Sequence, residues 1–158
     1  MHSNKPLTFL ASLRIAMIVG TSGIALSAQA QLGSTLQATS DPSSAAVVHQ
    51  AQNTALQWQE SVDANQIRVR QYLSAAGQVY AVSWDGPAMA NVAALLGTWF
   101  DAYQASAVAA QAGTQSLHAL HVERSDLVVE TAVRLRDFHG RAWLPAAIPA
   151  GVTTADIQ

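Results

Sequence analysis

The histidines are the residues of this sequence whose spacing most suggests a metal site. His118 and His121 lie three residues apart, and on a helix both imidazoles would face one ion. Residues 117–122, however, are predicted to form a strand, and residues three apart on a strand point to opposite faces. His121 would share its face with Glu123, and His139 could approach from another strand. Because a zinc site needs three or four ligands, we predict polar surface positions, no metal site and no cofactor.

A second group of residues suits acid–base catalysis. Asp137, His139 and Arg141 alternate on one face of a regular strand, and an Asp–His pair can orient a general base. No serine stands in a G-x-S-x-G nucleophile elbow, and Ser125 has no partner implied by the sequence. We therefore predict no catalytic residues, and a small envelope hydrolase using His139 or His121 is the alternative.

Two predicted strands joined by a turn, 67–73 and 79–84, carry arginines and aromatic residues on one face. They are Arg68, Arg70 and Tyr72 on the first strand and Tyr80 and Trp84 on the second. Cross-strand neighbours form stripes, and the simplest register places Arg68 over Trp84 in a cation–π contact. Arginine beside aromatic residues is the composition of binding hot spots. The candidate binding residues are Arg68, Arg70, Tyr72, Tyr80 and Trp84. This stripe either binds a partner or is covered by the segments 42–53 and 145–158.

The elements that position these residues begin with a predicted antiparallel meander over 56–62, 67–73 and 79–84. Asp85-Gly86-Pro87 ends it and starts a helix. The apolar residues of this helix recur at helical spacing: Val92, Leu95, Leu96, Trp99, Phe100 and Tyr103. We expect this stripe to be core.

A second meander is predicted after the helix, over 117–122, 127–131 and a strand that begins at Val133. The alternation slips before Phe138, which predicts a bulge near Asp137. With a short helix over 42–53, the predicted order is αβββαβββ. The fold class is therefore α+β, an antiparallel sheet of two three-strand meanders with one long amphipathic helix packed on it.

The N-terminal residues have the pattern of a signal peptide. Lys5 and Arg14 precede the apolar run 15–26, and Ala28-Gln29-Ala30 has the small residues of a cleavage site. The run is too short for a comfortable transmembrane helix. We expect cleavage after Ala30, a periplasmic or secreted protein and no stable membrane span afterwards. The predicted organisation is a signal peptide (1–30), a linker and short helix (31–54), a compact α+β domain (55–145) and a C-terminal tail (146–158).

Composition excludes several classes of function. Half of the 158 residues are apolar and 11% are charged, which is typical of a folded domain and not of a disordered chain. The absence of cysteine excludes disulfides, thiolate metal sites and cysteine nucleophiles. A net charge of −2 argues against nucleic acid as a partner.

Several segments together resemble a family of bacterial secreted proteins catalogued as domain of unknown function 2844. They are Leu32-Gly33, Val82-Ser83-Trp84-Asp85-Gly86-Pro87, Leu95-Leu96-Gly97-Thr98-Trp99-Phe100, Asp126-Leu127-Val128-Val129-Glu130, Phe138-His139-Gly140-Arg141-Ala142-Trp143-Leu144-Pro145 and Pro149-Ala150-Gly151-Val152. The resemblance implies an exported protein and supplies no catalytic residues.

These observations favour a non-enzymatic exported domain that binds a protein or envelope component. The hydrolase is the first alternative. The second is a carrier of a small apolar ligand between helix and sheet.

Overall fold

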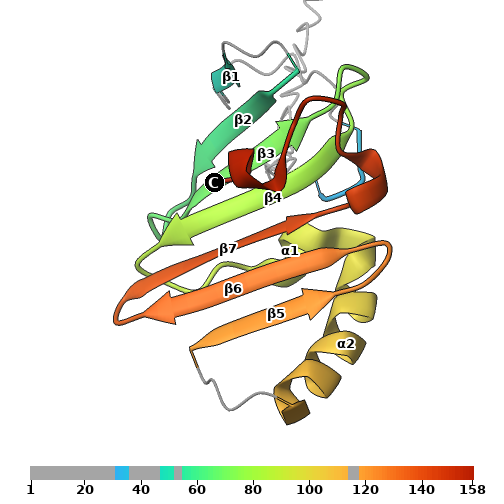
Figure 1. Ribbon diagram of the computed structural model, residues 1–158. Coiled ribbons are helices and arrows are strands. Elements are labelled where there is room, and N and C mark those ends of the chain that lie inside the picture. Colours follow the sequence, from blue (N-terminus) through green and yellow to red (C-terminus); the bar gives the residue numbers. More distant parts are fainter. Residues whose placement is uncertain (1–30, 36–46, 52–54, 114–117) are drawn as a thin grey trace, which may run out of the picture.

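The computed structural model describes residues 31–35, 47–51, 55–113 and 118–158 (Figure 1). In this part of the chain seven strands form one antiparallel sheet of order β1-β2-β3-β4-β7-β6-β5. The strands are β1 (Val47–Gln50), β2 (Gln57–Val62), β3 (Arg68–Leu73), β4 (Val79–Gly86), β5 (Ala119–Glu123), β6 (Val128–Arg134) and β7 (Asp137–Trp143). The helical segments are α1 (Val92–Leu96), η1 (Gly97–Trp99), α2 (Phe100–Gly113), η2 (Pro145–Ala147) and η3 (Thr154–Asp156). The α+β class is confirmed, and the two meanders join through β4 and β7.

The predicted helix over 42–53 is wrong where the structure describes it. Val47–Gln50 is the edge strand β1, which pairs with β2. Two successive β-branched residues favour a strand, and the ring of His49 stacks on Trp58 at 5.2 Å. The remaining residues of that predicted helix lie outside the described ranges. The element order is therefore four strands, the helix and three strands, in place of αβββαβββ.

The irregularities of the sheet also differ from those predicted. The slip before Phe138 comes from a two-residue turn and not from a bulge, because Arg134 pairs with Asp137. Leu135 takes a φ of 58° in that turn. A register shift does occur between β3 and β4, where Tyr72 faces Ala81 and its neighbour Leu73 faces Val79. Tyr80 is the extra residue of this bulge.

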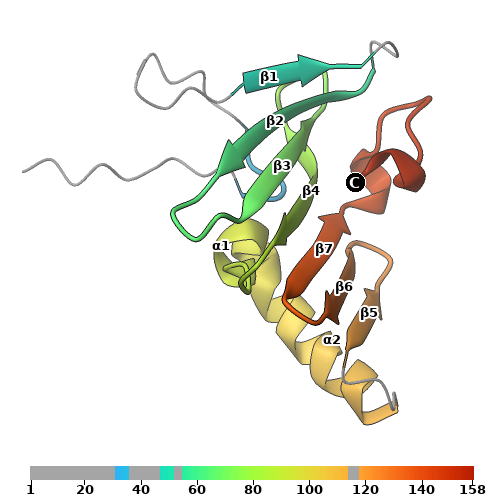
Figure 2. The same ribbon diagram turned by 90° about the vertical axis from the view of Figure 1, so that its left-hand side faces the viewer.

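One face of the sheet is covered by α1, η1 and α2, which follow one another across it (Figure 2). The predicted helical stripe packs here: Leu95 and Leu96 are buried, while Trp99, Phe100 and Tyr103 are half-buried against the core. The stripe is confirmed as a packing surface, but the helix is broken at Gly97 (φ 55°). The side chain of Gln31 lies where a Cβ on Gly97 would be.

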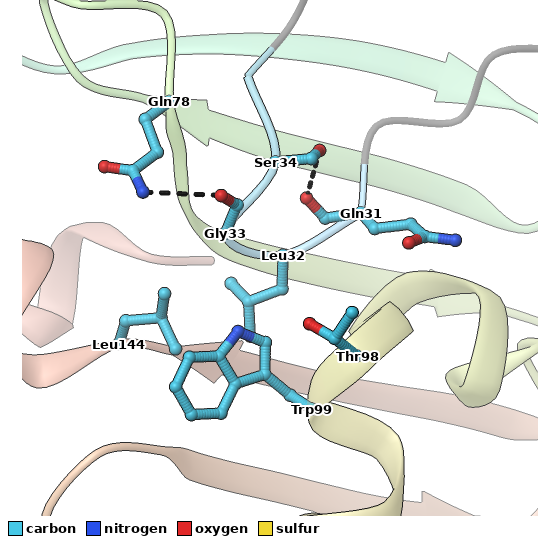
Figure 3. A pocket seen from close by; sticks show the side chains of 8 residues that line it. All are labelled: Gln31, Leu32, Gly33, Ser34, Gln78, Thr98, Trp99 and Leu144. Carbon is cyan, nitrogen blue, oxygen red and sulfur yellow. Dashed lines mark hydrogen bonds between the residues drawn. The ribbon is translucent and has the colours of Figure 1, made fainter.

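Leu32 joins residues 31–35 to the core on this side of the sheet. Leu32 is 2% exposed, and its N–H donates to the oxygen of Leu95 at 2.9 Å. The N–H of Gly33 donates to the oxygen of Val79 at 2.8 Å. Figure 3 shows Leu32 pointing toward the indole of Trp99. This short segment therefore links the helix to β4.

The opposite face of the sheet, which we call the open face, carries the C-terminal segment 145–158 (Figure 2). Helix and segment thus lie on opposite sides of one sheet. No helix of the described residues has the length and apolar character needed to cross a membrane.

Candidate functional site

A row of polar side chains crosses the open face, with one residue from each of six strands. The register of the sheet places them side by side in the order Glu60, Arg70, Ser83, Arg141, Glu130 and His121. The row has an internal symmetry, because an Arg–Glu pair stands on each side of Ser83. The row therefore places one guanidinium group on each side of β4, that of Arg70 and that of Arg141.

Each arginine of this polar row is held by its glutamate. Arg70 Nε lies 2.8 Å from Glu60 Oε2, and Arg141 Nε lies 2.6 Å from Glu130 Oε2. The hydrogen bond from Arg70 lowers the pKa of Glu60, and Glu60 in turn raises the pKa of Arg70. Both guanidiniums are therefore charged and fixed, and their Nη1 atoms remain for other acceptors.

Those acceptors are main-chain oxygens of the C-terminal segment. The oxygen of Gln158 accepts hydrogen bonds from Arg70 Nη1, Tyr72 Oη and Ser83 Oγ, each at 2.7 Å. Arg141 Nη1 donates to the oxygens of Thr154 at 2.8 Å and Ile157 at 3.1 Å. We call Arg70, Tyr72, Ser83 and Arg141 the donor cradle.

Beside the donor cradle lies an apolar cluster that receives the side chain of Ile157. Ile157 is 0% exposed and packs with Val152 in a cluster that contains Tyr72, Tyr80 and Trp143. The rings of Tyr72 and Tyr80 are 6.3 Å apart. Burial raises the pKa of Tyr80 to about 12, and its hydroxyl is buried without a hydrogen-bond partner among the residues that the structure describes. A buried donor of this kind carries a desolvation penalty.

A hollow of about 670 Å³ adjoins the other side of the C-terminal segment. On the open face, small side chains at Ala119 and Ala132 leave room between larger neighbours. Its polar lining comes from Ser83, Asp85, His121, Glu130, Thr131, His139, Arg141 and Gln158. The hollow therefore presents imidazole, carboxylate and guanidinium groups around an apolar floor.

The structure brings together only part of the predicted binding stripe. Arg68, Arg70 and Tyr72 lie on the open face, and the bulge turns Tyr80 into the apolar cluster there. Trp84 faces the helix side and is 4% exposed. The predicted contact of Arg68 with Trp84 is wrong, because the bulge shifts the register so that Arg68 faces Asp85, with Nη1 3.4 Å from Oδ2.

Sequence reasoning missed Ser83, Arg141 and the C-terminal segment as parts of one site. Arg141 was assigned to a strand face with His139, and that alternation was an available signal for the open face. The pairing of β7 with β4, which sets Arg141 opposite Ser83, has no signature in the sequence. The segment is held largely through its main-chain oxygens, which every residue type possesses.

The histidines lie at the edges of the site. His139 Nδ1 is 3.6 Å from Asp137 Oδ2, so the expected Asp–His neighbours do meet. His121 Nδ1 is 3.3 Å from Glu130 Oε1. Ser83 Oγ, a hydroxyl of the hollow, donates to Gln158. Across the described ranges, no three His, Cys, Asp or Glu side chains are grouped so as to hold a metal ion.

A smaller hollow of about 360 Å³ lies where residues 31–34 meet the helix (Figure 3). Trp99, Leu144 and Gln78 line it, and Gln78 Nε2 donates to the oxygen of Gly33 at 3.3 Å. The groups around it hold residues 31–34 in place, so we assign this hollow to the fold.

These features define an α+β protein with a helix on one face of an antiparallel sheet and an ordered donor cradle on the other. The model of the family described as "Protein of unknown function (DUF2844)" matches residues 28–157. The chain belongs to this family, as its sequence motifs indicated. No curated protein and no solved structure matches the chain.

Proposed function

We propose that this protein is an exported, non-enzymatic domain that binds a protein or envelope component on its open face. One observation carries the proposal: the donor cradle converges on main-chain oxygens of the C-terminal segment. Every residue of a polypeptide carries such an acceptor, so a partner chain can offer the same groups. The neighbouring hollow supplies room for further contacts with the partner.

The alternatives use the same surface differently. A hydrolase would need His139 or His121 to act on a nucleophile, and the serine of the hollow is instead a donor to Gln158. A carrier of apolar ligands would use space between helix and sheet, whereas the larger hollow lies on the open face. Binding is therefore the function that these contacts support best.

The test is an experiment in which purified protein captures partners from a periplasmic extract of the source cell. It compares the wild-type protein with a variant in which a large side chain fills the hollow. We expect Ala132→Trp to abolish capture of a specific partner, because the indole would occupy the hollow floor. Val108→Trp, on the exposed side of α2, is the matched control and should capture normally. Equal capture by both variants would contradict the proposal. Turnover of an ester or peptide substrate that is lost in His139→Ala would replace it with the hydrolase.

Export after cleavage at Ala30 is part of the proposal. Support comes from two limits that fall near this residue: the family match begins at 28, and Leu32 is already in the core. Intact mass and N-terminal sequencing of the protein from the periplasmic fraction should give a chain that starts at Gln31. Recovery of a membrane-bound chain that retains the first 30 residues would refute cleavage.

A further inference from the structure

We propose that the donor cradle is a receptor for a peptide with an aliphatic side chain followed by a carboxylate, and that residues 152–158, which include the helical turn η3, occupy it as an internal ligand. The inference deepens the proposed function, since it names the chemistry that the open face recognises. It rests on the contacts of the segment, on the donors around one oxygen and on a buried hydroxyl that the segment leaves without a partner.

The first step concerns which atoms of the segment are recognised. Three of its main-chain oxygens, at Thr154, Ile157 and Gln158, accept the hydrogen bonds that the donor cradle donates. The N–H of Gln158 in turn donates to Tyr72 Oη at 2.8 Å. The side chains of residues 153–156 are exposed. Every residue type carries a main-chain oxygen, so another peptide that folds the same turn can present the same acceptors.

The second step concerns the charge that the cradle prefers. Three donors meet at the oxygen of Gln158, and one of them is the guanidinium of Arg70. A neutral carbonyl oxygen has two lone pairs, so three donors exceed its ordinary capacity. Charged donors form their strongest hydrogen bonds with carboxylate oxygens. The donor set therefore suits an anionic oxygen.

The third step concerns the side chain that precedes this oxygen. Ile157 is completely buried among Tyr72, Tyr80 and Trp143, with Val152 as the second anchor. An aliphatic side chain fills this cluster, while a charged one would be buried without a partner. The surface thus selects an aliphatic residue next to the bound oxygen.

The fourth step concerns the fit of the segment itself. The hydroxyl of Tyr80 is buried under the same cluster and has no hydrogen-bond partner within the described part of the chain. Native structures leave few such groups unpaired, and each exception calls for a cause. The internal segment leaves this donor unmatched, and a ligand with an acceptor at that point would fit the cluster better.

The experiment frees the cradle in the full chain and offers it a peptide. Ile157→Asp should release the segment, because a carboxylate cannot remain in the apolar cluster. The probe is the acetylated peptide Val-Thr-Thr-Ala-Asp-Ile-Gln with a free carboxylate, titrated calorimetrically. We expect it to bind Ile157→Asp about tenfold or more tightly than wild type, where the tethered segment competes at an effective concentration on the order of millimolar.

Matched variants and peptides test each step. Adding Arg70→Gln to Ile157→Asp should lower the affinity for the peptide about tenfold, because a charged hydrogen bond is lost. Arg68→Gln is the control, since Arg68 lies on the same strand and its ion pairs are with Glu60 and Asp85. The peptide with a terminal amide should bind about tenfold more weakly than the acid. A peptide with Asp in place of Ile should not bind.

The results that would overturn the inference are equally definite. An Ile157→Asp protein with a cooperative urea transition that fails to bind the peptide would refute the receptor. Equal affinity for acid and amide would refute the carboxylate. If Ile157→Asp does not fold, the pair Thr153→Ala and Asp156→Ala loosens the segment instead, because both hydrogen bonds from Thr153 to Asp156 are lost. The peptide titration uses purified components only. A negative titration would therefore refute the peptide receptor, while the proposed function is tested separately by periplasmic capture and by its loss in Ala132→Trp.

Discussion

At the scale of single residues, Leu135 breaks a local rule of hairpin construction. It takes a φ of 58° in the turn between β6 and β7 and is 94% exposed. Two-residue hairpin turns require positive φ, which glycine and asparagine adopt at little cost and leucine does not.

Leu135→Gly should therefore stabilise the protein by about 1 kcal/mol, because the left-handed strain disappears and no buried contact is lost. The urea midpoint would measure it. Val108→Gly is the comparison, since this residue is also an exposed aliphatic but lies within α2, and glycine there should lower the midpoint. A lower midpoint for Leu135→Gly would show that the leucine makes a stabilising contact.

Gly140 is required for a different reason, which is space. A Cβ on this residue would collide with the indole of Trp84, its neighbour across β4 and β7. Gly140→Ala should destabilise the protein by about 1–3 kcal/mol through forced movement of that ring.

Gly151→Ala is the control for Gly140→Ala, because nothing lies within 4 Å of a Cβ at residue 151. Its φ of 86° leaves only the backbone penalty. A urea midpoint of Gly140→Ala equal to that of the wild type would show that the Trp84 ring moves without cost.

At the scale of elements, the helix shows that residues of one apolar stripe can be buried to different extents. Leu96 is 0% exposed, whereas Trp99 on the same apolar stripe is only half-buried. Leu96→Ala should lower the free energy of unfolding by about 2–5 kcal/mol. Trp99→Ala should cost less than a fully buried tryptophan would. Val108→Ala, at 68% exposure, should leave the urea midpoint almost unchanged.

The elements with strong patterns were predictable from the sequence, and the connections between them were less so. Alternation located β2, β3 and β4 to within one or two residues. It did not reveal the bulge at Tyr80. Both faces of the sheet are buried there, so an inserted residue causes no visible break in the pattern of polar and apolar residues. The turn at Leu135 was missed for the opposite reason, since leucine is a residue that such turns disfavour.

The candidate site was less predictable than the sheet. Arg70 and Tyr72 were identified because arginine beside an aromatic residue is a local pattern. Ser83 joins them because the bulge shifts the register of β3 against β4. Arg141 joins them only through the pairing of β7 with β4, two strands separated in sequence by the helix, β5 and β6. Gln158 takes part through its main-chain oxygen, which has no signature in any sequence.

At the scale of the whole molecule, each face of the sheet has its own cover and its own core. The helix and residues 31–35 close one face, and residues 145–158 lie on the other. The C-terminal segment is held over the apolar cluster by Ile157 and by the charged hydrogen bonds of the donor cradle. The free energy of unfolding should therefore depend on pH.

Acidification should weaken the molecule through Glu60, whose pKa is lowered by the hydrogen bond from Arg70. The folded state then binds fewer protons than the unfolded state, so the contribution of this group is present at neutral pH and is lost as the pH falls through its folded pKa. Urea midpoints between about pH 7 and pH 3 should fall less steeply for Glu60→Gln than for wild type. Glu123→Gln, an exposed carboxylate at 3.5 Å from His121, is the control. Parallel curves for wild type and Glu60→Gln would contradict the assignment.

The pairing of β4 with β7 has a consequence for how the chain reaches this structure. Until β7 is available, β4 is a sheet edge with unpaired backbone groups, and the apolar side chains of both cores stay in contact with solvent. Long-range pairing of this kind makes folding slow, and an exposed edge invites pairing with another chain. The emerging polypeptide should therefore remain unfolded until its last strand has been delivered.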